Sequence, residues 1–103
     1  MKIKRIKSLQ INAYTFKIVW DNSFSGGSFD YIAREIIIGT KQADDTLLLA
    51  ILCHELLEIT ATEMNVRLSR PDCNSDYIFV YDHRQFSTMN EIFTGLLSQF
   101  LTD

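Results

Sequence analysis

The chain has 103 residues, 47% hydrophobic and 22% charged, an ordinary composition for one globular domain spanning residues 1–103. Its formal net charge of −3 gives no basic surface of the kind that binds nucleic acid, so we expect no nucleic-acid partner. The apolar stretches are too short to cross a membrane or to form an export signal, and two cysteines do not make a disulfide framework. We therefore expect a cytoplasmic protein without a membrane partner.

The N-terminal half has the sequence pattern of β-strands. A first strand is expected to begin within residues 2–10. Over residues 14–20, large apolar residues at the even positions alternate with Thr15, Lys17 and Val19, which predicts a half-buried strand. Residues 29–32 and 35–39 predict two further strands joined by a tight turn near Ala33 and Arg34. The three consecutive isoleucines in the last segment favour a strand that is covered on both faces.

A helix is predicted from Asp44 to about Asn65. Asp44, Asp45 and Thr46 supply capping oxygens and negative charge directly before a long apolar run. Because the first two turns are apolar on every side, we expect a central helix with little exposed surface.

The C-terminal part predicts a short strand and a closing helix. The strand covers residues 77–81 and ends at Asp82 and His83. Thr88 and Glu91 form a possible capping box for an amphipathic helix, whose apolar residues are Met89, Ile92, Phe93, Leu96, Leu97, Phe100 and Leu101. The elements together predict an α+β fold, in which a mostly antiparallel sheet of about four strands packs against a central helix and a C-terminal helix.

The segment His54-Glu55-Leu56-Leu57-Glu58 is the part of the central helix suited to chemistry. His54 and Glu58 lie one turn apart on the same face, a spacing at which two side chains can hold one metal ion. In the zinc-protease signature His-Glu-x-x-His, the glutamate is the general base, and Glu55 has that position here. Because these groups are expected on a largely buried helix, a divalent ion would satisfy their charges.

A catalytic zinc site typically has three protein ligands, and His83 is the best candidate for the third. The set would then be His54, Glu58 and His83. The alternative third ligands are all carboxylates, which on their own would favour magnesium, manganese or calcium: Asp72, Asp76 and Asp82. Asp82 could instead orient a ligand from outside the coordination sphere.

The reaction expected from such a site is hydrolysis of a carbonyl compound. Glu55 would deprotonate a water activated by the metal, and Tyr77 or Tyr81 could donate a hydrogen bond to the developing oxyanion. The simplest substrate is a peptide or protein segment laid as an extra strand on an exposed edge of the sheet.

These segments resemble the minimal zincin-like metalloprotease fold, particularly small phage and prophage proteins. The resemblance is carried by residues 29–39, 51–59 and 77–86, which include the His-Glu-Leu-Leu-Glu helix and a histidine beyond the following strand. It implies a zinc ion held by His54, Glu58 and His83, with Glu55 as the base. The larger zincin families have a histidine where this chain has Glu58.

Two functions of different classes are consistent with this pattern. The first is a minimal zinc-dependent metallopeptidase, and the second is a catalytically inactive, metal-binding interaction module of phage or prophage origin. A nucleic-acid accessory role for the basic N-terminus is a third, weaker hypothesis. In a purely structural interpretation, Glu55 and Glu58 form the solvated stripe of a half-exposed helix, and His54 pairs with a backbone carbonyl.

Overall fold

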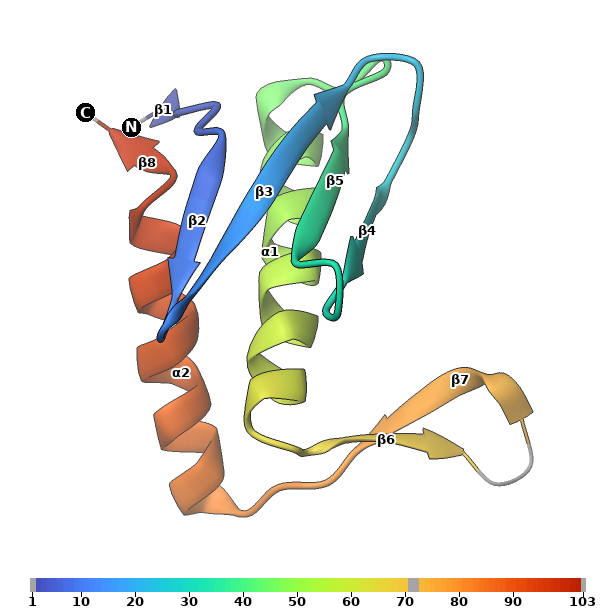
Figure 1. Ribbon diagram of the computed structural model, residues 1–103, viewed down its shortest axis with the longest axis vertical. Helices are drawn as coiled ribbons and strands as arrows, with labels where there is room; N and C mark the ends of the chain where they lie inside the picture. The colour runs from blue at the N-terminus through green and yellow to red at the C-terminus, as the bar shows by residue number, and fades with distance from the viewer. Residues whose placement is uncertain (1, 71–72, 103) are drawn as a thin grey trace.

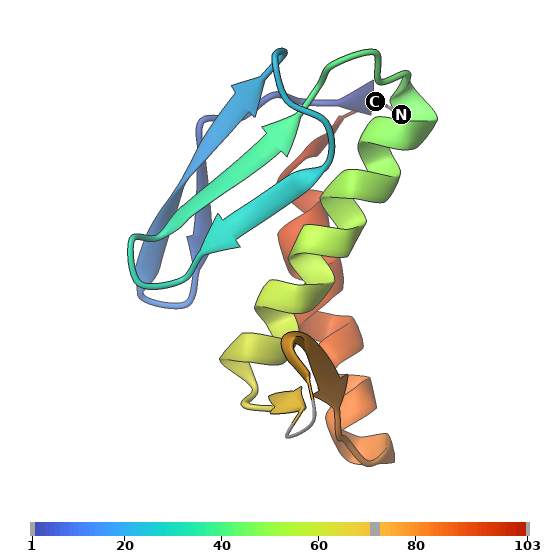
Figure 2. The same cartoon turned by 90° about the vertical axis from the view of Figure 1, so that its right-hand side faces the viewer.

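The computed structural model describes residues 2–70 and 73–102, which form a two-layer α+β domain. A four-stranded sheet makes one layer and the two helices make the other (Figures 1 and 2). In chain order the elements are β1 (Lys2–Ile3), β2 (Ser8–Ile11), β3 (Tyr14–Asp21), β4 (Gly27–Asp30), β5 (Glu35–Gly39), α1 (Asp45–Glu63), β6 (Arg67–Arg70), β7 (Cys73–Phe79), α2 (His83–Ser98) and β8 (Leu101–Thr102). The predicted fold class is confirmed.

The main sheet has the strand order β2-β3-β5-β4. Strand β3 is antiparallel to β2 and parallel to β5, and β4 returns antiparallel to β5. The predicted tight turn between β4 and β5 is present, with Arg34 in the left-handed region at φ 57°. Strand β4 is therefore an edge strand, and it packs directly against α1.

The hydrophobic core lies between the sheet and the two helices. Strand residues enter it with the period of two, and α1 contributes every third or fourth residue, as the two geometries require. The buried members are Leu9, Ile11, Phe16, Ile18, Ile36, Ile38, Leu48, Leu52, Leu56, Ile59, Leu96 and Phe100. Neither helix in the described part of the chain is long and apolar enough to cross a membrane.

Helix α1 begins as predicted but is more exposed than predicted. The carboxylate of Asp44 caps it by accepting the Leu47 N–H at 2.8 Å. Leu47 and Leu49 are 49% and 39% exposed, so the expectation that the first two turns are covered on all sides is wrong. The reason is size, because one small sheet and one second helix cannot surround α1.

The β6–β7 hairpin replaces the single strand expected at residues 77–81. Its strands pair Leu68 with Ile78 and Arg67 with Phe79, and it extends from the end of α1 away from the main sheet (Figure 1). The short strand β6 has only four residues, too few to show the period of a strand directly after a long helix.

Helix α2 begins at His83, five residues before Thr88. The predicted capping box at Thr88 and Glu91 is therefore wrong. The real box uses Asp82 and Gln85: the Asp82 side chain accepts the Gln85 N–H at 2.8 Å, and the Gln85 side chain accepts the Asp82 N–H at 2.9 Å. His83 consequently becomes the first residue of the helix. Beyond α2, the short strands β8 and β1 pair and bring the two ends of the described chain together (Figure 1).

Candidate metal site

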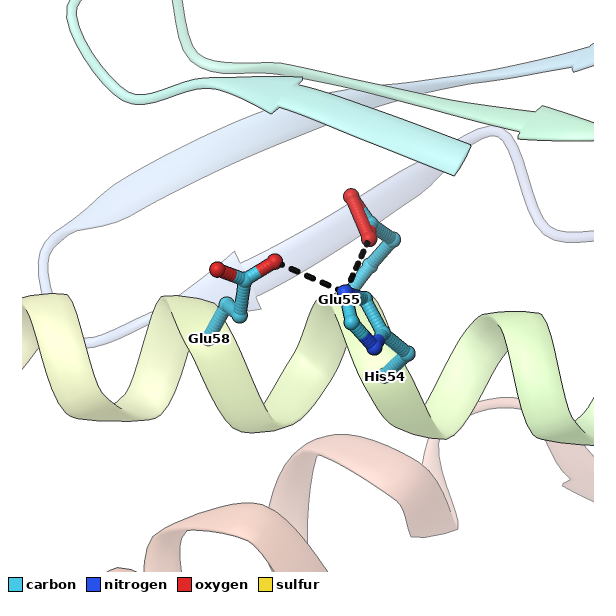
Figure 3. A group of neighbouring side chains, drawn as sticks. All are labelled: His54, Glu55 and Glu58. Atoms are coloured by element: carbon cyan, nitrogen blue, oxygen red, sulfur yellow. Dashed lines mark ion pairs between the residues drawn. The ribbon is translucent and has the colours of Figure 1, made fainter. Parts of the chain in front are cut away.

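Three side chains of α1 converge as the helical spacing predicts. The Nε2 atom of His54 lies 2.9 Å from Oε2 of Glu58 and 3.7 Å from Oε2 of Glu55 (Figure 3). One possible ligand atom from each residue lies within 4.8 Å of the others. Among the side chains that the structure describes, this is the one group of histidine, cysteine or acidic residues that could hold a metal ion.

The spacing and the donor types fit a divalent ion. Two ligands of a tetrahedral zinc ion with bonds of roughly 2.1 Å lie roughly 3.4 Å apart. The 2.9 Å separation of His54 from Glu58 is that of a hydrogen-bonded pair and must widen slightly to admit an ion. One imidazole nitrogen with carboxylate oxygens suits zinc and also harder divalent metals. The group could therefore bind a metal, and its chemistry leaves the identity of the metal open.

Burial differs sharply among the three residues. The side chain of His54 is 68% exposed, that of Glu58 is 22% exposed and that of Glu55 is 4% exposed. The expectation that all three lie on a largely buried helix face holds for Glu55 and is wrong for His54. Burial raises the pKa of Glu55 above its usual range; His54 and Arg67 oppose this rise, and the neighbouring Glu58 adds to it.

Glu55 is buried because the edge strand β4 packs over it. Its carboxyl points toward the sheet in Figure 3, and it lines a cavity of about 330 Å³ together with His54, Gly26 and Gly27. A Cβ atom at Gly27 would lie 2.8 Å from Cγ of Glu55 and 3.0 Å from Cγ2 of Ile51. The missing side chain at Gly27 therefore lets β4 approach the helix at this point.

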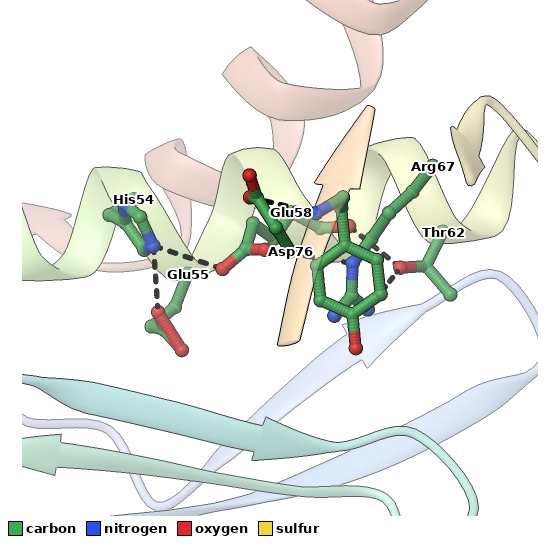
Figure 4. Close-up of polar contacts among 7 residues, drawn as sticks. His54, Glu55, Glu58, Thr62, Arg67 and Asp76 are labelled. Atoms are coloured by element: carbon green, nitrogen blue, oxygen red, sulfur yellow. Dashed lines mark hydrogen bonds and ion pairs between the residues drawn. The ribbon is translucent and has the colours of Figure 1, made fainter. Parts of the chain in front are cut away.

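Arg67, the first residue of β6, contacts the other oxygen of Glu58. Its Nε lies 3.6 Å from Oε1 of Glu58, and its Nη1 donates to Oγ1 of Thr62 at 3.3 Å (Figure 4). The guanidinium carbon lies 3.7 Å from the ring centre of Tyr77 and 5.2 Å from that of Phe29. The sequence interpretation missed Arg67 because it follows the end of α1, where helical periodicity gives no information.

A second cavity opens on the hairpin side of the helix. It has a volume of about 450 Å³. The charged or ionisable residues His54, Glu58 and Asp76 line it together with apolar and aromatic residues, which are Leu57, Ala61, Tyr77, Phe79, Tyr81 and Met89. The structure therefore brings two of the proposed auxiliary residues, Tyr77 and Tyr81, and one of the alternative third ligands, Asp76, to the cavity that His54 and Glu58 line.

The remaining candidate ligands lie elsewhere. His83 is exposed, its ring stacks on Phe86 with centroids 6.4 Å apart, and it belongs neither to the His54 group nor to the cavity lining. Asp82 is occupied as the cap of α2, and Asp72 lies outside the described residues. The capping box explains the placement of His83, because it directs this residue into the first turn of α2. A role for His83 as third ligand stays a prediction.

No protein-family model, curated protein or solved structure matches the chain. The convergence of His54, Glu55 and Glu58 on one helix beneath a four-stranded sheet is compatible with a zincin-like fold and does not by itself diagnose one. An inference about function must therefore rest on the geometry of the site.

Proposed function

We propose that the protein is a small metal-dependent hydrolase, a zincin-like peptidase in which His54 and Glu58 bind a divalent ion and Glu55 is the general base. The observation that carries this proposal is the convergence of an exposed imidazole, a half-buried carboxylate and a buried carboxylate around one point on α1. Zinc is our first expectation, because an imidazole nitrogen and a carboxylate oxygen are both ligands that catalytic zinc sites use.

The roles follow from where each side chain lies. A bound zinc ion supplies Lewis acidity that polarises a substrate carbonyl and favours ionisation of a water. Glu55, whose burial raises its pKa, would take a proton from the attacking water at a carboxylate oxygen while the water oxygen bonds to the carbonyl carbon. It would then pass this proton to the leaving amine as the C–N bond breaks. The exposed side of His54 leaves the site open for substrate to approach from solvent.

We propose Asp76 as the third protein ligand in preference to His83. Asp76 comes from the hairpin and lines the same cavity as His54 and Glu58, whereas His83 does not line it. Zinc titration of Asp76→Asn and His83→Ala separates the two, since removal of a true ligand should weaken affinity by at least about tenfold.

The proposed substrate is an extended peptide or protein segment. The free edge of β4 offers unpaired backbone groups beside Glu55, and an extended peptide adds to such an edge by main-chain hydrogen bonds. The hairpin-side cavity, with its tyrosine, phenylalanine and methionine walls, is suited to an apolar side chain of that peptide.

Cleavage of an unstructured protein such as casein by the zinc-loaded protein tests this function. We expect Glu55→Gln to lower the rate by roughly 100-fold or more while the zinc content stays unchanged, because the base contributes to the reaction and not to metal binding. Glu91→Gln, an exposed glutamate on α2, is the matched control and should cleave like the wild type. Equal activity of Glu55→Gln and wild type, or no zinc-dependent cleavage, would contradict the proposal.

A non-catalytic, metal-binding interaction module is the second candidate. It is favoured by exposed apolar side chains on the hairpin and directly after it, with Leu68, Ile78 and Val80 exposed by 44%, 39% and 57%. Such a surface is typical of a protein contact. In that case the wild type would bind zinc without cleaving any peptide, and Glu55→Gln would leave partner binding intact.

A further inference from the structure

We propose that Arg67 is a positioning residue of the metal site. It holds one oxygen of Glu58 so that the other oxygen faces His54. Through this contact it couples metal binding to the docking of the β6–β7 hairpin. The inference rests on the proposed function, which it deepens by assigning a role outside the α1 segment.

The two oxygens of Glu58 have different partners. Oε2 lies 2.9 Å from His54, and Oε1 lies 3.6 Å from Nε of Arg67. Figure 4 shows Glu58 between these two residues. The terminal torsion of a glutamate is otherwise broad, so a cation on one side restricts the direction in which the other oxygen points. Groups that orient a ligating carboxylate in this way raise metal affinity.

Arg67 has an unsatisfied donor directed to this contact. Its Nε is buried and has no hydrogen-bond partner, since 3.6 Å to Oε1 is too long for a hydrogen bond. Zinc ligands lie roughly 3.4 Å apart, so the 2.9 Å separation of His54 and Glu58 must widen when an ion enters. Figure 4 shows Arg67 on the side of Glu58 away from His54. The part of this widening that Glu58 makes would therefore shorten the Arg67–Glu58 contact and satisfy the buried N–H.

The same arginine attaches the hairpin to the body of the protein. Its guanidinium lies over Tyr77 of β7, faces Phe29 of β4 at a longer distance and bonds to Thr62 of α1. Beyond these contacts the hairpin extends away from the main sheet (Figures 1 and 2). Because coupling between two equilibria is reciprocal, an ion that tightens the Arg67–Glu58 contact also stabilises the docked hairpin.

Zinc affinity of arginine variants is the first test, measured by competition with a chelating indicator. We expect Arg67→Ala to bind zinc roughly 10- to 100-fold more weakly than the wild type, and Arg67→Lys to recover part of this loss because it keeps the charge without the planar fork. Arg84→Ala, an exposed arginine on α2, is the control and should bind like the wild type. The absorption spectrum of bound cobalt should also change in Arg67→Ala, which a purely structural role of the arginine would not cause.

Hydrogen exchange of the wild-type protein is the second test and needs no variant to fold. Zinc should slow amide exchange in residues 67–70 and 73–79 more than in β2 and β3, which do not contact the site. Equal zinc affinity of Arg67→Ala and wild type, or hairpin exchange that zinc does not change, would overturn the inference while the metal site stands. A wild type that binds no zinc overturns this inference together with the proposed function.

Discussion

Glu55 is the residue at which stability and chemistry conflict. It is 3% exposed, and the nearest group able to carry a positive charge toward it, His54, lies 3.7 Å away and is itself exposed. Burial therefore disfavours the ionised carboxylate and raises its pKa. A base with a raised pKa is useful near neutral pH, and the same burial destabilises the folded protein there.

Glu55→Gln should therefore stabilise the metal-free protein at neutral pH. Since the folded-state pKa is raised, the folded protein holds the Glu55 proton more tightly than the unfolded chain does. The resulting stabilisation is full below the unfolded pKa of about 4.3 and is lost as the pH rises through the folded-state pKa. Glutamine does not ionise, so the Glu55→Gln variant keeps this stabilisation as the pH rises.

Urea denaturation with EDTA from pH 4 to pH 8 measures this difference. The variant should gain free energy of unfolding relative to the wild type as the pH rises, and the two proteins should converge toward pH 4. A gain that does not depend on pH, or a variant less stable than the wild type at pH 8, would show that burial of the charge is not the cause.

Residue patterns predicted the helical part of the site and not its surroundings. His54 and Glu58 were predictable because an i, i+4 spacing places two side chains together on any helix. Arg67 was not, because its approach to Glu58 depends on how the chain reverses after α1. The placement of His83 in the first turn of α2 was also missed, because the capping signal at Asp82 and Gln85 was present in the sequence but was assigned to Thr88 and Glu91.

At the scale of elements, the close approach of β4 to α1 shapes the site. Gly27→Ala would place a Cβ atom 2.8 Å from Cγ of Glu55, so β4 or Glu55 must shift. We expect a loss of about 1–3 kcal/mol in the free energy of unfolding, together with reduced peptidase activity. Urea denaturation and the casein assay measure the two effects.

Gly95→Ala is the matched control for this substitution. Gly95 lies in α2, and a Cβ atom there would meet nothing within 4 Å. Because alanine is the better helix former, this variant should gain about 0.5–1 kcal/mol. A Gly27→Ala protein with unchanged stability and activity would mean that β4 does not hold Glu55 in place.

The elements with clear periodicity were predicted, and those fixed by pairing were not. Strand β3 has large apolar residues at every second position from Tyr14 to Trp20, and α1 has a strong cap, so local sequence was sufficient for both. Strands β6, β1 and β8 are two to four residues long, and each exists through its partner strand. Such pairings depend on the whole chain, which is why local patterns did not reveal them.

In the molecule as a whole, α1 serves the core and the site at once. Its buried residues Leu48, Leu52, Leu56 and Ile59 hold the helix against the sheet and α2, while His54 and Glu58 remain accessible beside the hairpin. The core therefore fixes the helix on which the donors are placed, and the edge strand and the hairpin complete their environment. Because the core residues of α1 and not its donor residues hold the helix in place, we expect the protein to keep its fold when the metal is removed.

The metal content of the purified protein, measured as isolated and again after dialysis against zinc, tests the central claim most directly. We predict one equivalent of tightly held zinc per chain in the wild type and in Glu91→Gln, and none in His54→Ala, whose circular dichroism spectrum should remain that of the folded protein. A wild type without stoichiometric metal in both preparations, or a His54→Ala protein that retains it, would contradict the claim.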